Sequence, residues 1–179
     1  MIKAYIDYFR HQAASHPALL HTAERRVFEV TSFEESWGDF RTVMKEKDYM
    51  MRLILPNGKV VGEADDNISV LGGFIIAKYW DKRNEGDQAI EMALDKSFEV
   101  GTDILTKMIY DSENEHPLWY WTAGSATMLD VSWQTKLYTG DTQYAGILFT
   151  FRWQTSWMNC ISHPSAPAWT DGGETPFLD

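Results

Sequence analysis

The sequence predicts an α+β protein in which an antiparallel sheet carries one long helix across one face. Near the end of the chain, apolar and polar residues alternate, with Phe149, Phe151 and Trp153 on one side and Arg152 on the other. A period of two is that of a β-strand. Residues 85–111 instead place apolar side chains three and four positions apart, which is the period of a helix. An N-terminal helix, a long C-terminal hairpin and an extended tail complete the expected architecture.

The chain is expected to begin with an amphipathic helix over residues 2–14, whose apolar face carries Tyr5 and Phe9. A His-Pro pair ends this helix, because the residue before a proline disfavours helical angles. A short strand over residues 26–31 follows. A serine that can act as an N-cap, followed by acidic residues, then predicts a short helix or turn over residues 33–45.

Three strand segments are predicted in the next part of the chain. Residues 49–55 alternate, and Pro56-Asn57-Gly58 predicts a tight hairpin turn, since Asn-Gly supplies the positive φ angles that such turns need. Residues 59–62 would be the partner strand. Residues 68–80 are apolar on both faces, which predicts a central strand. Gly72-Gly73 within it predicts a bulge or a close backbone approach.

The long helix has one apolar stripe and one charged face. The stripe consists of Ile90, Ala93, Leu94, Phe98, Gly101, Ile104, Leu105 and Met108. The opposite face carries Glu91, Asp95, Glu99, Asp103 and Lys107. Because Gly101 has no side chain, we expect the helix backbone to lie close to the sheet at this position.

Two long strands, residues 126–138 and 145–157, are expected to form the closing hairpin. In the first of them, we expect Leu129, Val131, Trp133 and Leu137 to point inward and Asp130, Ser132, Gln134 and Lys136 to point outward. Residues 1–159 would then be a single α+β domain. Residues 160–179 contain three of the six prolines and are expected to be an irregular C-terminal tail.

Composition narrows the classes of function. The 179 residues carry a formal net charge of −10, which disfavours a surface that grips nucleic acid through clustered cations. Cys160 is the single cysteine, so neither an internal disulfide nor a thiolate metal cluster is expected. Without a signal peptide or an apolar run of membrane-spanning length, we expect a soluble protein made in the cytoplasm, with no membrane partner.

The sequence also offers little catalytic chemistry. His11, His16 and His21 lie five residues apart, a spacing that does not place them on one helical face, so no metal site is predicted. A Gly-x-Ser-x-Gly elbow and a phosphate-binding glycine loop are both absent, and Cys160 with His163 lacks the surroundings of a thiol enzyme. We therefore predict no catalytic residues and no cofactor, and a protein that is not an enzyme. Dispersed acids leave an enzyme of another kind open.

The order of elements resembles that of the tail-terminator and neck (head–tail connector) proteins of tailed bacteriophages. In that family an N-terminal helix precedes antiparallel strands, a long helix crosses the sheet and a late hairpin closes it. The resemblance implies a structural virion protein that forms a homo-oligomeric ring, usually hexameric, in the tail or neck. Its partners would be other virion proteins, and DNA would pass through the ring without sequence-specific binding. The particle would be assembled in the host cytoplasm.

Within this interpretation, four residues are candidates for the contacts between subunits: Arg152, Trp153, Trp157 and Trp169. Aromatic residues and arginine are enriched at the centres of protein interfaces. For Trp153 and Trp157 a place in the core of their own domain stays open.

A different class of function is a small-ligand or protein-binding module. An aromatic cluster of Trp119, Tyr120, Trp121 and Trp133 would then line a pocket between the long helix and the sheet.

Overall fold

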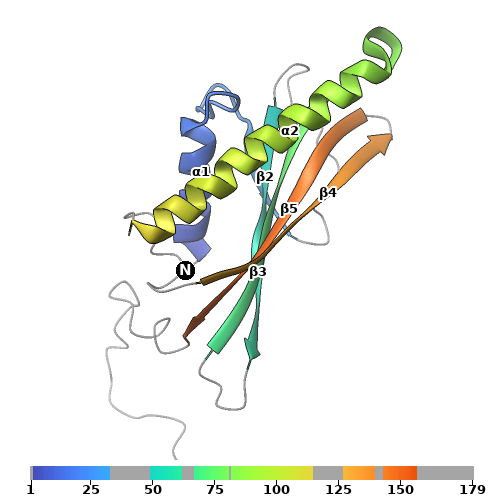
Figure 1. The fold of residues 1–179 in the computed structure, drawn as a ribbon. Coiled ribbons are helices and arrows are strands. Elements are labelled where there is room, and N and C mark those ends of the chain that lie inside the picture. The colour runs from blue at the N-terminus through green and yellow to red at the C-terminus, as the bar shows by residue number, and fades with distance from the viewer. Residues whose placement is uncertain are drawn as a thin grey trace, which may run out of the picture.

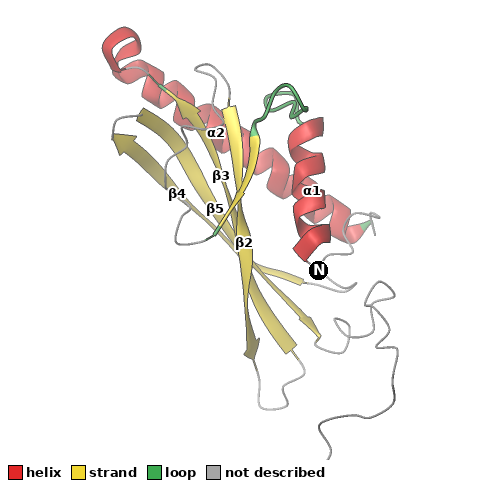
Figure 2. Ribbon diagram, turned by 180° about the vertical axis from the view of Figure 1, so that it is seen from behind, coloured by secondary structure: helices red, strands yellow, loops and turns green. Residues whose placement is uncertain are grey.

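Both helices lie on the same face of one sheet (Figure 1 and Figure 2). The computed structural model describes residues 2–32, 49–61, 67–80, 82–114, 127–139 and 143–156. In these ranges the elements follow one another as α1 (Ile2–Ser15), β1 (Phe28–Thr31), β2 (Tyr49–Val61), β3 (Asn67–Tyr79), α2 (Lys82–Glu113), β4 (Thr127–Thr139) and β5 (Gln143–Ser156). The predicted α+β fold class is confirmed.

The strands of the described sheet lie in the order β1-β2-β3-β5-β4, so β1 and β4 are its edges. Neighbouring strands from β2 to β4 are antiparallel, as the sequence predicts. The pairing of β1 with β2 is parallel, with Val30 opposite Leu53, so the prediction of a fully antiparallel sheet was wrong at this edge. A parallel pair needs a crossover connection of about a dozen residues or more, and residues 32–48 are long enough to provide one.

The predicted hairpin turn at Pro56-Asn57-Gly58 was wrong. Strand β2 continues through these residues and pairs with β3 until Val61 lies opposite Asn67, so the chain reverses between them. The register shifts between Ile54 and Asn57, where β2 has one residue more than β3. Turn-forming residues suit such a bulge, because it interrupts the ladder locally and tolerates a proline.

Helix α2 packs on β3 and β5, and its contact with β5 is very close. A Cβ atom at Gly101 would lie 2.0 Å from a ring carbon of Phe149, whose side chain is fully buried. The close approach predicted at Gly101 is therefore confirmed. The first turn of α2 is kinked at Gly86, where φ is 67°.

Helix α1 is joined to the sheet and to α2 by buried polar groups. The Tyr5 hydroxyl donates to the backbone carbonyl of Ile54 at 3.1 Å. The Asp111 carboxylate, which is fully buried, accepts from the Tyr8 hydroxyl at 2.9 Å and forms an ion pair with Lys107. Burial and the nearby Asp111 charge raise the pKa of Tyr8, so this hydroxyl remains a donor.

Strand β4 differs most from the prediction. We expected Val131, Trp133 and Leu137 to be inward-facing, but their exposed fractions are 40%, 59% and 52%. These residues do lie on the helix side of the sheet, but the expectation that they are buried there was wrong, because α2 packs mainly on β3 and β5 and leaves β4 largely uncovered. The predicted helix or turn at residues 33–45 and the tail at residues 160–179 lie outside the described residues.

Candidate functional site

The edge strand β4 presents an apolar row to the side of the sheet that carries the helices. The row consists of Val131, Trp133 and Leu137. Val131 and Trp133 pair with Phe151 and Phe149 of β5, which are buried on the helix side. Because directly paired residues share a face, the apolar row continues the core layer beyond the helices and into solvent.

One aromatic contact joins this row to α2. The ring of Phe98, on α2, meets the Trp133 ring edge to face, with centroids 5.5 Å apart. Phe98 itself is 36% exposed, although the sequence placed it on the inward stripe of the helix. Together, Phe98 and the apolar row leave an aromatic and aliphatic surface open at one edge of the molecule.

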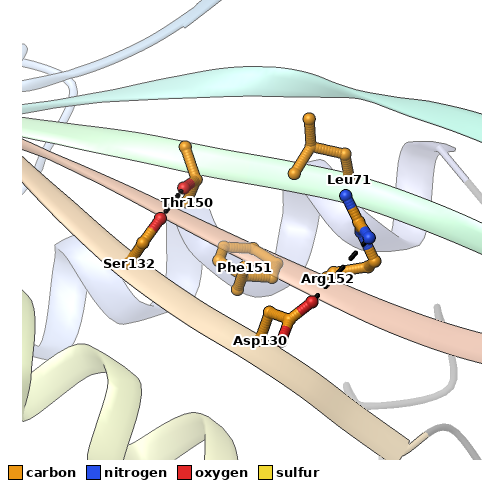
Figure 3. A pocket seen from close by; sticks show the side chains of 6 residues that line it. All are labelled: Leu71, Asp130, Ser132, Thr150, Phe151 and Arg152. Carbon is orange, nitrogen blue, oxygen red and sulfur yellow. Dashed lines mark hydrogen bonds and ion pairs between the residues drawn. The ribbon is translucent and has the colours of Figure 1, made fainter.

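The other face of the same hairpin is polar (Figure 3). There the hydroxyls of Ser132 and Thr150 form a hydrogen bond of 2.7 Å, and the Arg152 guanidinium lies 3.8 Å from the Asp130 carboxylate. These four residues, with Leu71 and Phe151, line a hollow of about 250 Å³. Its polar groups are directed mainly at one another, an arrangement that suits a surface patch better than the binding of a charged ligand.

Strand β4 also has an open backbone edge in the described part of the chain. It pairs with β5 on one side, and none of the described strands pairs with its other side. From Asp130 to Thr135 every side chain is exposed, on both faces. The edge therefore offers a row of N–H and C=O groups together with the apolar row.

The groups with shifted pKa values lie away from β4. Burial raises the pKa of Tyr5 and of Tyr8, both on α1. Desolvation lowers the pKa of His21, and a hydrogen bond from Lys3 lowers that of Asp7. Across the described ranges, no cluster of three or more His, Cys, Asp or Glu side chains is arranged to hold a metal ion. Within the same ranges, neither helix has the length and apolar character of a membrane span.

Two of the four candidate interface residues can be located. Arg152 is on the surface, beside Asp130. Trp153 is 2% exposed and stacks on Tyr5 and Phe151 at centroid distances of 5.9 and 5.7 Å, which is the core role that the sequence left open. Trp157 and Trp169 lie outside the described residues.

The proposed aromatic cluster is represented by one residue in the described part. Trp133 is exposed on the edge strand, whereas Trp119, Tyr120 and Trp121 lie outside the described residues. Sequence reasoning missed Val131 and Leu137 as surface residues. The missing information was strand order, because alternation shows that a strand has two faces but not whether a helix covers either of them.

Comparison of the sequence with models of known families finds no matching family, and comparison with curated proteins finds no matching relative.

Proposed function

We propose that the protein is a structural subunit of a homo-oligomer and that the β4 edge is a contact surface between subunits. The observation that carries this proposal is the exposed apolar row of Val131, Trp133 and Leu137 on an open edge strand. Natural edge strands are usually short, charged, interrupted by proline or covered, since an open edge can pair with another chain. Strand β4 has 13 residues and no proline.

The finer proposal is a ring-forming tail-terminator or neck protein of a tailed phage or phage-like particle. Two features support it. The described elements run in the order helix, three strands, long helix and hairpin, which the family shares. The net charge of −10 suits a ring through which DNA passes without being held, because like charges repel within a Debye length of about 8–10 Å. Its partners would then be other virion proteins, and its location the virion.

The binding-module alternative has weaker support. An aromatic pocket between α2 and the sheet needs space there, but at Gly101 the Phe149 ring fills that space. Trp133, which would line the pocket, is instead exposed at the edge of the sheet. In the described part of the chain, the exposed apolar surface is thus open and elongated. Such a surface suits contact with another protein better than binding of a small ligand.

The proposal is tested by measuring the mass of the purified chain in solution over a range of concentrations, with light scattering or mass photometry. We expect oligomers at micromolar concentration, and negative-stain images of rings if the finer proposal holds. Trp133→Ser is expected to weaken association by about thirtyfold or more, because truncating a central interface tryptophan costs about 2 kcal/mol or more.

The matched control is Tyr110→Ser, since Tyr110 on α2 is also 59% exposed but lies outside the apolar row. This variant is expected to associate like the unmodified chain. A monomer at every concentration, with no assembly on adding companion proteins, would contradict the proposed function. If both substitutions weaken association equally, the β4 edge is not the contact surface between subunits.

A further inference from the structure

We propose that β4 pairs with β4 of a second copy of this chain, antiparallel, about a twofold axis that passes beside Trp133. This inference rests on the proposed function and names the partner of the same edge. It is based on the residues that lie at equal distances before and after Trp133 in the strand. Asp130 lies three residues before it and Lys136 three residues after it.

Two antiparallel copies of one strand pair residue i with residue j so that the sum of the two numbers is constant. With Trp133 opposite Trp133 of the second copy, Asp130 lies opposite Lys136 and Lys136 opposite Asp130. The twofold axis thus creates two cross-strand pairs of opposite charge. Directly opposed charges of unlike sign stabilise a pair of strands, whereas like charges destabilise it.

The faces of the sheet agree with this register. Asp130 and Lys136 pair with Arg152 and Gly146 of β5, on the face away from the helices, whereas Trp133 pairs with Phe149 on the helix face. In the dimer, the charged pairs would lie on one face, and the two tryptophans would meet on the other, next to Phe98 of each copy. The two sheets would become one, with all four described helices on the same side.

Other registers lose these contacts. A slip that moves the axis by one residue places Asp130 opposite Gln134 or Tyr138, so neither charge pair forms. If the numbers of two opposite residues add up to an odd number, the helix face of one copy lies on the same side as the polar face of the other. The carboxylate of Asp130 remains able to accept a second cation, since its side chain is 72% exposed and Arg152 is 3.8 Å away.

A twofold contact uses the same surface on both copies and therefore closes on itself. It cannot alone produce a ring. A ring built with it needs a second, different contact, and the complete assembly must contain an even number of subunits. This holds for a ring of alternating contacts and for two rings stacked face to face.

Charge reversal tests the register. Asp130→Lys would place two lysines opposite each other at both pairs, and Lys136→Asp would place two aspartates there. We expect either single variant to raise the dissociation constant of the dimer by about tenfold, since two cross-strand pairs change from attraction to repulsion. The double variant, with both substitutions in one chain, restores both pairs and is expected to recover the original constant.

Mixing the two single variants is the decisive experiment. One chain then carries lysine at both positions and the other aspartate at both, so the mixed dimer has two attractive pairs and should form in preference to either homodimer. Damage to the folding of a single variant cannot produce this rescue. The control mixes Lys96→Asp with Glu99→Lys, which alter an exposed pair on α2 and should leave the mass unchanged.

The outcomes separate this inference from the proposed function. If the unmodified chain is oligomeric and the single variants keep its mass, β4 pairing is wrong while the proposed function stands. If the unmodified chain is a monomer at every concentration, alone and with companion proteins, both fall. If deletion of residues 160–179 creates a dimer from a monomer, the tail of the same chain occupies the edge and the inference is wrong. Failure of the mixed variants to associate, when the unmodified chain does, overturns the register.

Discussion

Replacing Gly101 with alanine tests how closely α2 lies on the sheet. An alanine Cβ would stand 2.0 Å from one ring carbon of Phe149 and 2.2 Å from another. Ordinary contacts between carbon atoms are about 3.5–4.0 Å, so the ring or the helix would have to move by roughly 1.5 Å. The ring has little room to move, because it is fully buried and stacks on Phe74 with centroids 5.1 Å apart.

Two opposing terms set the size of the effect. Alanine is better than glycine in a helix by about 1 kcal/mol. Overpacking a well-filled core costs about 1–3 kcal/mol, and a contact this short belongs at the upper end of that range. We therefore expect Gly101→Ala to lower the free energy of unfolding by about 1–2 kcal/mol.

The assay is urea unfolding followed by circular dichroism at one fixed protein concentration. Thr106→Ala, at an exposed position of the same helix, is the control and should change stability by less than about 0.5 kcal/mol. Combining Gly101→Ala with Phe149→Leu removes the obstructing ring, so the two substitutions should be strongly non-additive. A gain of about 1 kcal/mol from Gly101→Ala alone would refute the close contact, because only helix propensity would then remain.

Two further predictions concern buried polar groups. Stability is expected to fall as the pH rises above about 10, because Tyr5 keeps its proton in the folded state, where burial raises its pKa, but ionises near 10 once unfolded. This group contributes about 1.4 kcal/mol per pH unit in that range, so Tyr5→Phe should flatten the measured slope, and an unchanged slope would argue against the buried hydroxyl. Arg52→Ala is expected to cost about 3 kcal/mol, since Arg52 is buried and its guanidinium lies 3.0 Å from Glu29 across the parallel pair of strands. Lys3→Ala breaks an exposed ion pair with Asp7 and should hardly change the urea midpoint, so equal effects of these two substitutions would contradict the assigned burial.

Local patterns predicted the elements whose apolar residues form the core. The apolar run at residues 68–80 became the central strand β3, and the stripe with Gly101 became the inner face of α2. Gly72 also fits its prediction, since a Cβ there would lie 2.8 Å from the Trp153 ring. These predictions succeed because the period of apolar residues reports directly on which face is buried.

Features that depend on strand order were not predictable from one sequence. The Asn57-Gly58 pair has the chemistry of a turn, yet the pairing of β2 with β3 continues past it and absorbs it next to a bulge. The alternation in β4 is genuine, but it gives no indication that α2 touches Trp133 only through Phe98 among the described contacts and leaves it 59% exposed. The candidate site therefore emerged only once the edge of the sheet was known.

The most direct test of self-association through β4 is hydrogen exchange of its backbone amides, measured below and above the concentration at which the chain associates. About half of the amides of an edge strand point away from its neighbour in the sheet. If β4 pairs with a second copy, those outward amides between Asp130 and Leu137 gain protection as the oligomer forms, while the amides of β3 do not change. An increase in mass without added protection in β4 would contradict the account.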